Sequence, residues 1–200
     1  RFAFEIARSR PRKLLTLVTK SNAQRHGMVM WDEIFEEISQ DYRDITTDKM
    51  LVDAMTTRMV LDPQSIDTVV ASNLHADILT DLAASLSGSM GIAPTGNLDP
   101  EKRHPSMFEP IHGSAFDIMG QGIANPIGSY WSAVMMLENL GELKASQRLM
   151  SAIEKLTSDK KILPKDLGGK SSSKEVKKAM INIISGTNKK LTSIGLNLGK

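Results

Sequence analysis

The sequence has no cysteine among its 200 residues, only 4% aromatic residues and no long apolar run. Without cysteine there is no disulfide, no thiolate metal site and no cysteine nucleophile, which is typical of proteins in a reducing cytoplasm. No segment approaches the roughly 20 apolar residues that a membrane-spanning helix needs. The formal net charge is only +2, and acids and bases alternate along most of the chain. Since nucleic-acid binders usually concentrate basic residues, we expect a cytoplasmic protein that binds neither nucleic acid nor membrane.

What is present is typical of a folded protein, with 40% hydrophobic and 24% charged residues. The length suits one sizeable domain or two small ones. The chain opens on RFAFEIARSR, an amphipathic helix already in progress, whose buried face is predicted to include Phe2 and Ile6, with Phe4 as a further candidate. Because such a helix needs a partner, we expect the chain to be the C-terminal part of a longer protein.

Strand patterns and helix patterns alternate along the chain, which predicts an α/β architecture. Strands are expected at 13–19 and 66–72 and in a short segment from 107, and helices at 31–40, 46–63, 75–88, 127–140, 142–157 and 173–186. The segment 89–106 is rich in glycine and proline and is predicted to be a loop. The glycine-rich break near 88–97 divides the chain into 1–87 and 88–200. No G-x-G-x-x-G follows a strand, so any dinucleotide must be held by other means.

Two acids lie four residues apart in ASNLHADILTD (71–81). On a helix this spacing places Asp77 and Asp81 on one face, where like charges repel each other unless a cation lies between them. Mg²⁺ or Mn²⁺ accepts such oxygen ligands, and Asp53 on an apolar stretch is a candidate third ligand. A solvated acidic face explains the same spacing, and the spacing does not show that the three acids meet.

Two further segments have candidate chemistry. Lys20 follows a predicted strand, where it serves either as a general base or as an ordinary surface lysine. In FEPIHGSAFDIMGQGIANP (108–126), Gly113 lets backbone N–H groups approach an anion, His112 suits a ligand contact, and Asp117 suits the two hydroxyls of a ribose. A glycine-rich surface connection with a capping aspartate is the alternative interpretation.

Together, the three motifs resemble the isocitrate/isopropylmalate dehydrogenase family over nearly the whole chain. TKSNAQRHGMVMWDE (19–33) looks closest to its tartrate dehydrogenase/decarboxylase and D-malate dehydrogenase branch. The resemblance implies an isopropylmalate-dehydrogenase-like fold, of which this chain is the C-terminal part of a two-domain, mixed-sheet enzyme. Residues 1–87 then belong to the small, dimerisation domain and residues 88–200 to the large, NAD-binding domain.

The resemblance also implies the roles of individual residues. Asp77 and Asp81 ligate Mg²⁺ or Mn²⁺, with Asp53 supplied by the second subunit of a homodimer. Lys20 is the catalytic lysine and also reaches across that interface. The residues implied to contact the cofactor are Asn22, His112, Gly113, Ser114, Ala115, Asp117 and Asn125. Asp117 and Ile118 favour NAD, because a carboxylate repels the 2′-phosphate of NADP.

The implied reaction is oxidative decarboxylation of a 2-hydroxy dicarboxylate, tartrate or D-malate, with hydride transfer to NAD. The alternatives are a 3-isopropylmalate dehydrogenase and a non-catalytic, nucleotide-binding regulatory subunit. Two residues depart from the family pattern: His75 stands where the family usually has Phe, and Phe116 stands where it usually has Pro. Because the family's substrate arginines and protonating tyrosine lie upstream of the region matching Arg1, the 200 residues alone are expected to be inactive.

Overall fold

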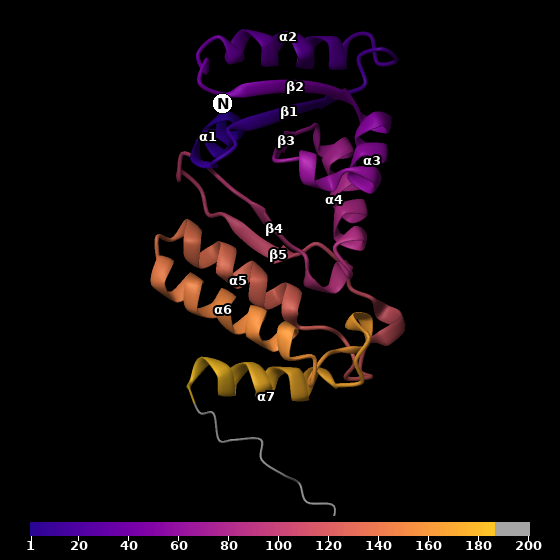
Figure 1. Ribbon diagram of the computed structural model, residues 1–200, viewed down its shortest axis with the longest axis vertical. Coiled ribbons are helices and arrows are strands. Elements are labelled where there is room, and N and C mark those ends of the chain that lie inside the picture. Colours follow the sequence, from indigo (N-terminus) through magenta and orange to yellow (C-terminus); the bar gives the residue numbers. More distant parts are fainter. Residues whose placement is uncertain (187–200) are drawn as a thin grey trace, which may run out of the picture. The chain divides into compact units, whose positions relative to one another are not determined.

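The computed structural model describes residues 1–186, and the chain divides into two compact units. The first unit runs from Arg1 to Gly88, and the second begins at Ser89, one residue from the expected division between 87 and 88. Helices alternate with strands in the first unit, and helices dominate the second (Figure 1). The architecture is the α/β class that the sequence predicts. Within residues 1–186, no helix combines the length and the apolar character needed to cross a membrane.

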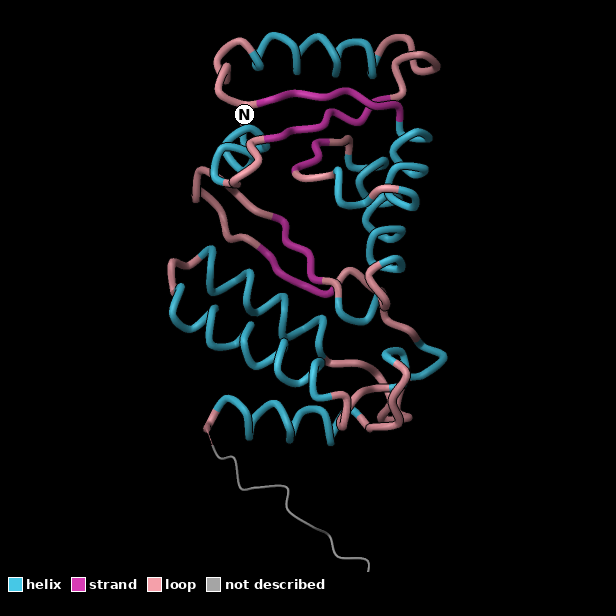
Figure 2. Tube along the Cα trace, viewed as in Figure 1, coloured by secondary structure: helices cyan, strands magenta, loops and turns pink. Residues whose placement is uncertain are grey.

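The first unit is built on a three-stranded parallel sheet in the order β2-β1-β3 (Figure 2). Its elements are α1 (Phe2–Ser9), β1 (Leu14–Thr19), α2 (Gly27–Ser39), β2 (Thr46–Leu51), α3 (Val52–Leu61), the 3-10 turn η1 (Pro63–Ser65), β3 (Thr68–Val70) and α4 (Asn73–Leu86). The central strand β1 is an apolar run because a central parallel strand is covered on both faces.

Helices cover both faces of this sheet. Side chains three positions apart on a strand point to opposite faces, and Leu15 and Val18 of β1 accordingly belong to different core clusters. Leu15 packs in one cluster with Phe4 of α1, whereas Val18 packs in another with Met55 of α3 and Leu79 of α4. The helices that follow β2 and β3 therefore share one core and start from the same end of the sheet.

That end is the carboxyl edge of the three parallel strands. Thr19 and Leu51, the last residues of β1 and β2, are register partners, and Leu17 of β1 is paired with Val70, the last residue of β3. Side chains just beyond the strands are therefore brought together at one edge, which is where open α/β sheets usually bind ligands.

The expected helix over 46–63 is wrong in its first third. Residues 46–51 form strand β2, which pairs with β1 from Leu14↔Thr46 to Thr19↔Leu51, and only 52–61 is helical. The β-branched Thr46 and Thr47 suit a strand, and pairing with an apolar neighbour overrides the helical spacing of the apolar residues that follow.

The buried face of α1 differs in part from the expectation, since only one of its three candidate residues, Phe4, is buried. Phe4 is 2% exposed, whereas Phe2 and Ile6 are 45% and 39% exposed. Phe4 lies between Phe35 and Tyr42, with ring centroids 5.1 and 4.7 Å away. Aromatic stacking therefore fixes the rotation of α1, and the other large apolar side chains of this helix remain partly in solvent.

As far as Gly186, the second unit contains a two-stranded antiparallel sheet and three long helices. Its elements are η2 (Met90–Ile92), β4 (Pro94–Asn97), β5 (Met107–Pro110), η3 (Phe116–Ile118), α5 (Ile127–Asn139), α6 (Leu143–Asp159), η4 (Lys165–Leu167) and α7 (Ser173–Ile184). The loop expected over 89–106 is therefore partly wrong, because it contains η2 and β4. The sequence did not indicate β4 because glycine and proline are rare in strands. Glycine suits position 96, since a Cβ there would lie 3.2 Å from the ring of Phe108 on the paired strand.

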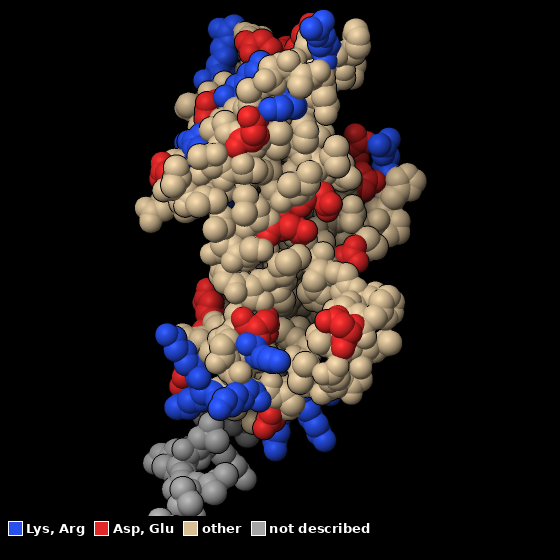
Figure 3. All heavy atoms as spheres, turned by 90° about the vertical axis from the view of Figure 1, so that its right-hand side faces the viewer, with Lys and Arg blue, Asp and Glu red and all other residues tan. Residues whose placement is uncertain are grey.

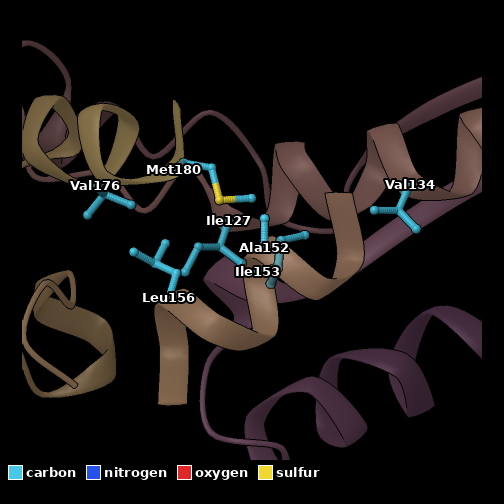
Figure 4. Packing of buried hydrophobic residues seen from close by; sticks show 7 residues of the cluster. All are labelled: Ile127, Val134, Ala152, Ile153, Leu156, Val176 and Met180. Atoms are coloured by element: carbon cyan, nitrogen blue, oxygen red, sulfur yellow. The ribbon is translucent and has the colours of Figure 1, made fainter. Parts of the chain in front are cut away.

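The core of the second unit lies between its three long helices (Figure 4). It joins Ile127 and Val134 of α5, Ala152, Ile153 and Leu156 of α6, and Val176 and Met180 of α7. The expected capping box at the start of α7 is confirmed, since Ser172 and Glu175 bond to each other's backbone amides. The polar faces of these helices lie in solvent, where basic and acidic side chains are mixed (Figure 3).

Candidate functional site

Lys20 and Asp53 meet at the carboxyl edge of the parallel sheet. Lys20 follows β1 directly, and Asp53 is the second residue of α3. The Lys20 Nζ lies 2.5 Å from the Asp53 Oδ1, and the two side chains are 27% and 66% exposed. Hydrogen bonds from Lys20 and from the backbone at the start of α3 lower the pKa of Asp53 below its usual value. Asp53 is therefore ionised at neutral pH. A metal cation that binds the Asp53 carboxylate would compete with Lys20 for it.

A tight turn after β1 fixes the backbone of Lys20. Its carbonyl accepts hydrogen bonds from the amides three and four residues later, at 3.0 and 2.9 Å. The Trp31 indole on α2 donates to the carbonyl of Val18 at 3.3 Å, which anchors the end of the strand. Asn22, the residue implied to lie near the nicotinamide, is exposed within this turn.

Asp32 on α2 is a residue that sequence reasoning missed. Its side chain is 14% exposed, and its Oδ2 lies 2.5 Å from the Lys49 Nζ on β2. Burial raises the pKa of Asp32, but Lys49 and the hydroxyls of Thr19 and Ser21 outweigh burial and leave the pKa below its usual value. The charged carboxylate of Asp32 therefore lies beside the end of β1 and the start of the turn that contains Lys20. Its position in an acidic helix gave no signal of this contact.

Asp77 and Asp81 lie one turn apart on α4, and both are exposed. Leu79 between them is 2% exposed and holds α4 on the sheet, whereas Ile78 is 54% exposed. Among residues 1–186, no lysine or arginine forms an ion pair with either acid. The two carboxylates therefore share one exposed face of α4, as the spacing predicts, and this placement fits a solvated acidic face as well as a pair of metal ligands.

The structure does not gather the three expected metal ligands within one chain. In the described part of the chain, no group of three histidine, cysteine or acidic side chains is placed to hold a metal ion. Asp53 contacts Lys20, while Asp77 and Asp81 lie on another helix. Two adjacent carboxylates are suitable ligands for a hard divalent cation such as Mg²⁺. Such an ion takes six or more oxygen ligands, so the others must come from water, a substrate or another copy of the chain.

A cavity of about 1120 Å³ lies in the second unit. Five of the expected cofactor residues line it: His112, Gly113, Ser114, Ala115 and Asn125. Ala115 adopts a left-handed backbone with φ of 44°, which turns the chain into η3. A Cβ built on Gly113 would meet nothing within 4 Å, so this loop faces open space.

Asp117, the expected ribose ligand, is not among the residues that line the cavity. It is exposed in η3, while its neighbour Ile118 is a lining residue. Its backbone carbonyl accepts a hydrogen bond from the Gln121 side chain at 2.7 Å, which holds the turn. The carboxylate itself remains in solvent at the end of the loop that borders the cavity.

Ser89 and Asp166 also line the cavity, and sequence reasoning missed both. The Asp166 Oδ2 accepts hydrogen bonds from the Ser89 hydroxyl and, at 2.9 Å, from the Asn125 Nδ2. Since 77 residues separate Ser89 from Asp166, no local pattern could have joined them.

The cavity fits a nucleotide cofactor in size and in chemistry. Cofactor sites are concave, largely preformed, and combine apolar walls with a few fixed polar groups. Here the walls include Met90, Ile118, Met119 and Ile123, while Asn125 supplies an amide and the loop before η3 supplies backbone groups. The segment from His112 to Asn125 therefore borders a volume large enough for a ligand of this class.

Comparison with known proteins gives a consistent picture. The family model for isocitrate/isopropylmalate dehydrogenase matches residues 1–183. A probable tartrate dehydrogenase/decarboxylase of Agrobacterium vitis is 63% identical over 188 residues, which are 94% of this chain and 52% of that protein. The decarboxylating D-malate dehydrogenase of Escherichia coli is 44% identical over 92% of this chain and 52% of its own length.

A solved structure agrees with the sequence relatives. The isocitrate dehydrogenase from Methylococcus capsulatus superposes with a TM-score of 0.87 at 37% identity, over 92% of this chain and 54% of its own. This chain therefore spans about half the length of the relatives that it matches.

Proposed function

Because this chain belongs to the isocitrate/isopropylmalate dehydrogenase family, we propose that it works as part of an NAD- and metal-dependent dehydrogenase. The proposed reaction oxidises and decarboxylates a 2-hydroxy dicarboxylate, tartrate or D-malate. Its sequence relatives are decarboxylating dehydrogenases by name, which supports the reaction type. The observation that carries the proposal is the Lys20–Asp53 pair, which combines a candidate base and a candidate metal ligand at one sheet edge.

Lys20 is the proposed proton acceptor for the substrate hydroxyl. Its side chain is only 27% exposed, and the turn after β1 holds its backbone, so the amine is presented at a defined position. A lysine that acts as a base must approach the substrate oxygen in its neutral form. Exchange of the Asp53 contact for the substrate hydroxyl would free the Nζ for this role.

Asp77 and Asp81 are the proposed metal ligands of one protomer. A divalent cation held there supplies Lewis-acid stabilisation of the negative charge that develops on substrate oxygens. The two exposed carboxylates provide the charge for such an ion without a competing lysine or arginine among residues 1–186. The ion also relieves the repulsion between acids one helical turn apart.

We propose that Lys20 and Asp53 serve the active site of the second subunit in a homodimer. Supporting this, Asp53 and the pair Asp77 and Asp81 do not form a three-acid cluster within the described part of one chain. A second copy that brings Asp53 to Asp77 and Asp81 would complete the oxygen ligands and would carry Lys20 with it, because the two side chains are in contact.

The cavity of the second unit is the proposed NAD site. His112 and the loop to Ala115 would line the adenosine and phosphate side, with Asn125 at the adenine. Asp117 would accept the ribose hydroxyls after its exposed side chain turns toward the cavity mouth. Asn22 is a proposed nicotinamide contact only because its motif resembles that of the family. NAD accepts the hydride, so the protein residues only bind and orient it.

The decisive experiment is a turnover assay on protein whose denatured intact mass has been measured. D-malate, tartrate and 3-isopropylmalate are each supplied with NAD⁺ and Mn²⁺, and NADH formation is followed by absorbance. Protein well above 21.9 kDa is expected to produce NADH from D-malate or tartrate and to lose this activity in Lys20→Met. Protein of 21.9 kDa is expected to be inactive, and NADH formation by it would overturn the site assignment.

A regulatory role is tested by metal binding. A non-catalytic subunit has no chemical need for Lys20, Asp53, Asp77 and Asp81 together, so their presence supports catalysis. If the protein binds NADH but no Mn²⁺ and turns over none of the three substrates, the regulatory alternative replaces the proposal.

A further inference from the structure

Three segments that are distant in sequence converge on one oxygen atom beside the cavity. Ser89 precedes η2, Asn125 ends the glycine-rich loop, and Asp166 lies in η4. The Asp166 Oδ2 accepts hydrogen bonds from both the Ser89 hydroxyl and the Asn125 Nδ2. All three residues line the cavity, so one carboxylate oxygen joins three parts of its wall.

The hydrogen bonds extend beyond this oxygen to the backbone on both sides. The amide of Gly91 donates to the Ser89 Oγ, and the amide of Ile127 donates to the Asn125 Oδ1, both at 2.9 Å. Asn125 therefore uses one end of its amide on the first residue of α5 and the other end on Asp166. This arrangement fixes which end is oxygen and which is nitrogen, and therefore which polar atoms remain for a ligand.

Gly91 of η2 packs closely against Asp166 and Asn125. A Cβ added to Gly91 would lie 2.5 Å from the Asp166 Oδ2 and 3.1 Å from the Asn125 Cβ. The backbone of η2 thus lies directly against the shared oxygen and its donors. A change at Asp166 therefore acts directly on the backbone of η2, which forms part of the cavity wall.

We propose that Asp166 is a positioning residue that orients the Asn125 amide and holds η2 and η4 together at the adenosine end of the cavity. The proposal rests on the proposed function, because it assumes that this cavity binds NAD. It assigns to Asp166 the role of a hydrogen-bond acceptor, since both donors end on a single oxygen. An uncharged acceptor at that atom should therefore preserve most of the effect.

The test compares Asp166→Leu with Asp166→Asn in the full chain. Leucine removes the acceptor with little change in size, whereas asparagine can place its amide oxygen where Oδ2 now lies. NADH affinity is measured by fluorescence titration, and folding by thermal unfolding. We expect Asp166→Leu to weaken NADH binding about tenfold or more and Asp166→Asn to stay within about threefold of the wild type.

The matched control is Asp159→Leu at the end of α6. Asp159 is in the same unit and is 52% exposed, and its one ion pair among residues 1–186 is with Lys161 at 3.0 Å. Its replacement should leave NADH affinity unchanged, which separates the loss of this acceptor from the general effect of a new surface leucine.

Amide hydrogen exchange tests the hydrogen bonds donated by the amides of Gly91 and Ile127 and does not require NADH. In Asp166→Leu, the amides of Gly91 and Ile127 should exchange faster, because their acceptors Ser89 and Asn125 are no longer held. In Asp166→Asn, exchange of both amides should remain close to that of the wild type. This readout also applies to a variant that is less stable but still folded.

The outcomes distinguish the two proposals. Normal NADH affinity in Asp166→Leu would overturn the positioning role, and equal losses in both variants would show that charge, not acceptor geometry, matters. If the wild type binds no NADH, the proposed function fails. The hydrogen bonds around Asp166 are then tested by amide hydrogen exchange alone. Unchanged protection of the Gly91 and Ile127 amides in Asp166→Leu would refute the positioning role.

Discussion

Lys20 and Asp53 are 33 residues apart in sequence, yet the Lys20 Nζ lies 2.5 Å from the Asp53 Oδ1. The contact follows from the sheet, because β1 and β2 are parallel neighbours whose last residues, Thr19 and Leu51, are in register. Each functional side chain comes just after its strand. The pairing of the two strands therefore brings the backbones of Lys20 and Asp53 close together, so the Lys20 side chain spans only a short distance to Asp53.

The first prediction concerns the titration of Asp53. Replacement of its partner in Lys20→Met should raise the pKa of Asp53 toward 3.8, the ordinary value for aspartate. Carbon-detected NMR of the carboxyl groups measures this directly. Asp44, whose pKa is held at about 2 chiefly by Arg8, should titrate unchanged in the same variant.

The direction of the pH dependence follows from this shift. Since the pKa of Asp53 is lower in the folded state, its pairing stabilises the fold fully above the unfolded-state pKa. That contribution is lost as the pH falls through the lowered, folded-state pKa. The difference in unfolding free energy between the wild type and Lys20→Met should therefore be constant near neutrality and shrink in acid. A difference that grows in acid would contradict the ion pair.

The second prediction concerns the acids of α4. Asp77→Asn and Asp81→Asn should each weaken Mn²⁺ binding about tenfold or more, because each removes one of two adjacent ligands. Binding is measured by electron paramagnetic resonance of free Mn²⁺. Asp62→Asn, an exposed aspartate just after α3, serves as the control and should bind as the wild type does. Equal binding in all variants would place the ion elsewhere.

The third prediction concerns a glycine that packing requires. A Cβ on Gly169 would lie 1.9 Å from the carbonyl oxygen of Leu163, so Gly169→Ala should destabilise the second unit by about 3 kcal/mol. Gly27→Ala is the contrast, because its Cβ would meet nothing within 4 Å at the start of α2. It should stabilise the first unit slightly, by up to about 1 kcal/mol.

These two effects can be measured separately by urea unfolding. Trp31 lies in α2 of the first unit and Trp131 in α5 of the second, and the sequence has no other tryptophan. Variants that keep only one of them, with phenylalanine at the other position, report each unit alone. A Gly169→Ala effect seen only through Trp31 would contradict the assignment of this packing to the second unit.

Local patterns predicted most of the helices and three of the five strands, because their periodicity and capping residues are contained in short segments. The Ser172–Glu175 box shows this, as does the run that forms β1. The missed strands β2 and β4 depend on partners instead. Their threonine, glycine and proline residues form strands only because β1 and β5 supply the hydrogen bonds.

The site divides in the same way. The spacing of Asp77 and Asp81 predicts a shared helical face, and the structure places them there. The contact between Lys20 and Asp53 required the order of the strands, which the expected helix over 46–63 had concealed. The contacts of Asp166 required the tertiary fold itself, since its donors lie 77 and 41 residues away.

The account is tested most directly by titrating the chain with NADH and, separately, with NADPH. The cavity bounded by His112, Ala115 and Asn125 predicts saturable NADH binding that Asp166→Leu weakens. The exposed carboxylate of Asp117 at the adjoining loop predicts that NADPH binds about tenfold or more weakly, because its 2′-phosphate is repelled. Absence of saturable NADH binding would contradict the assignment of this cavity as the cofactor site.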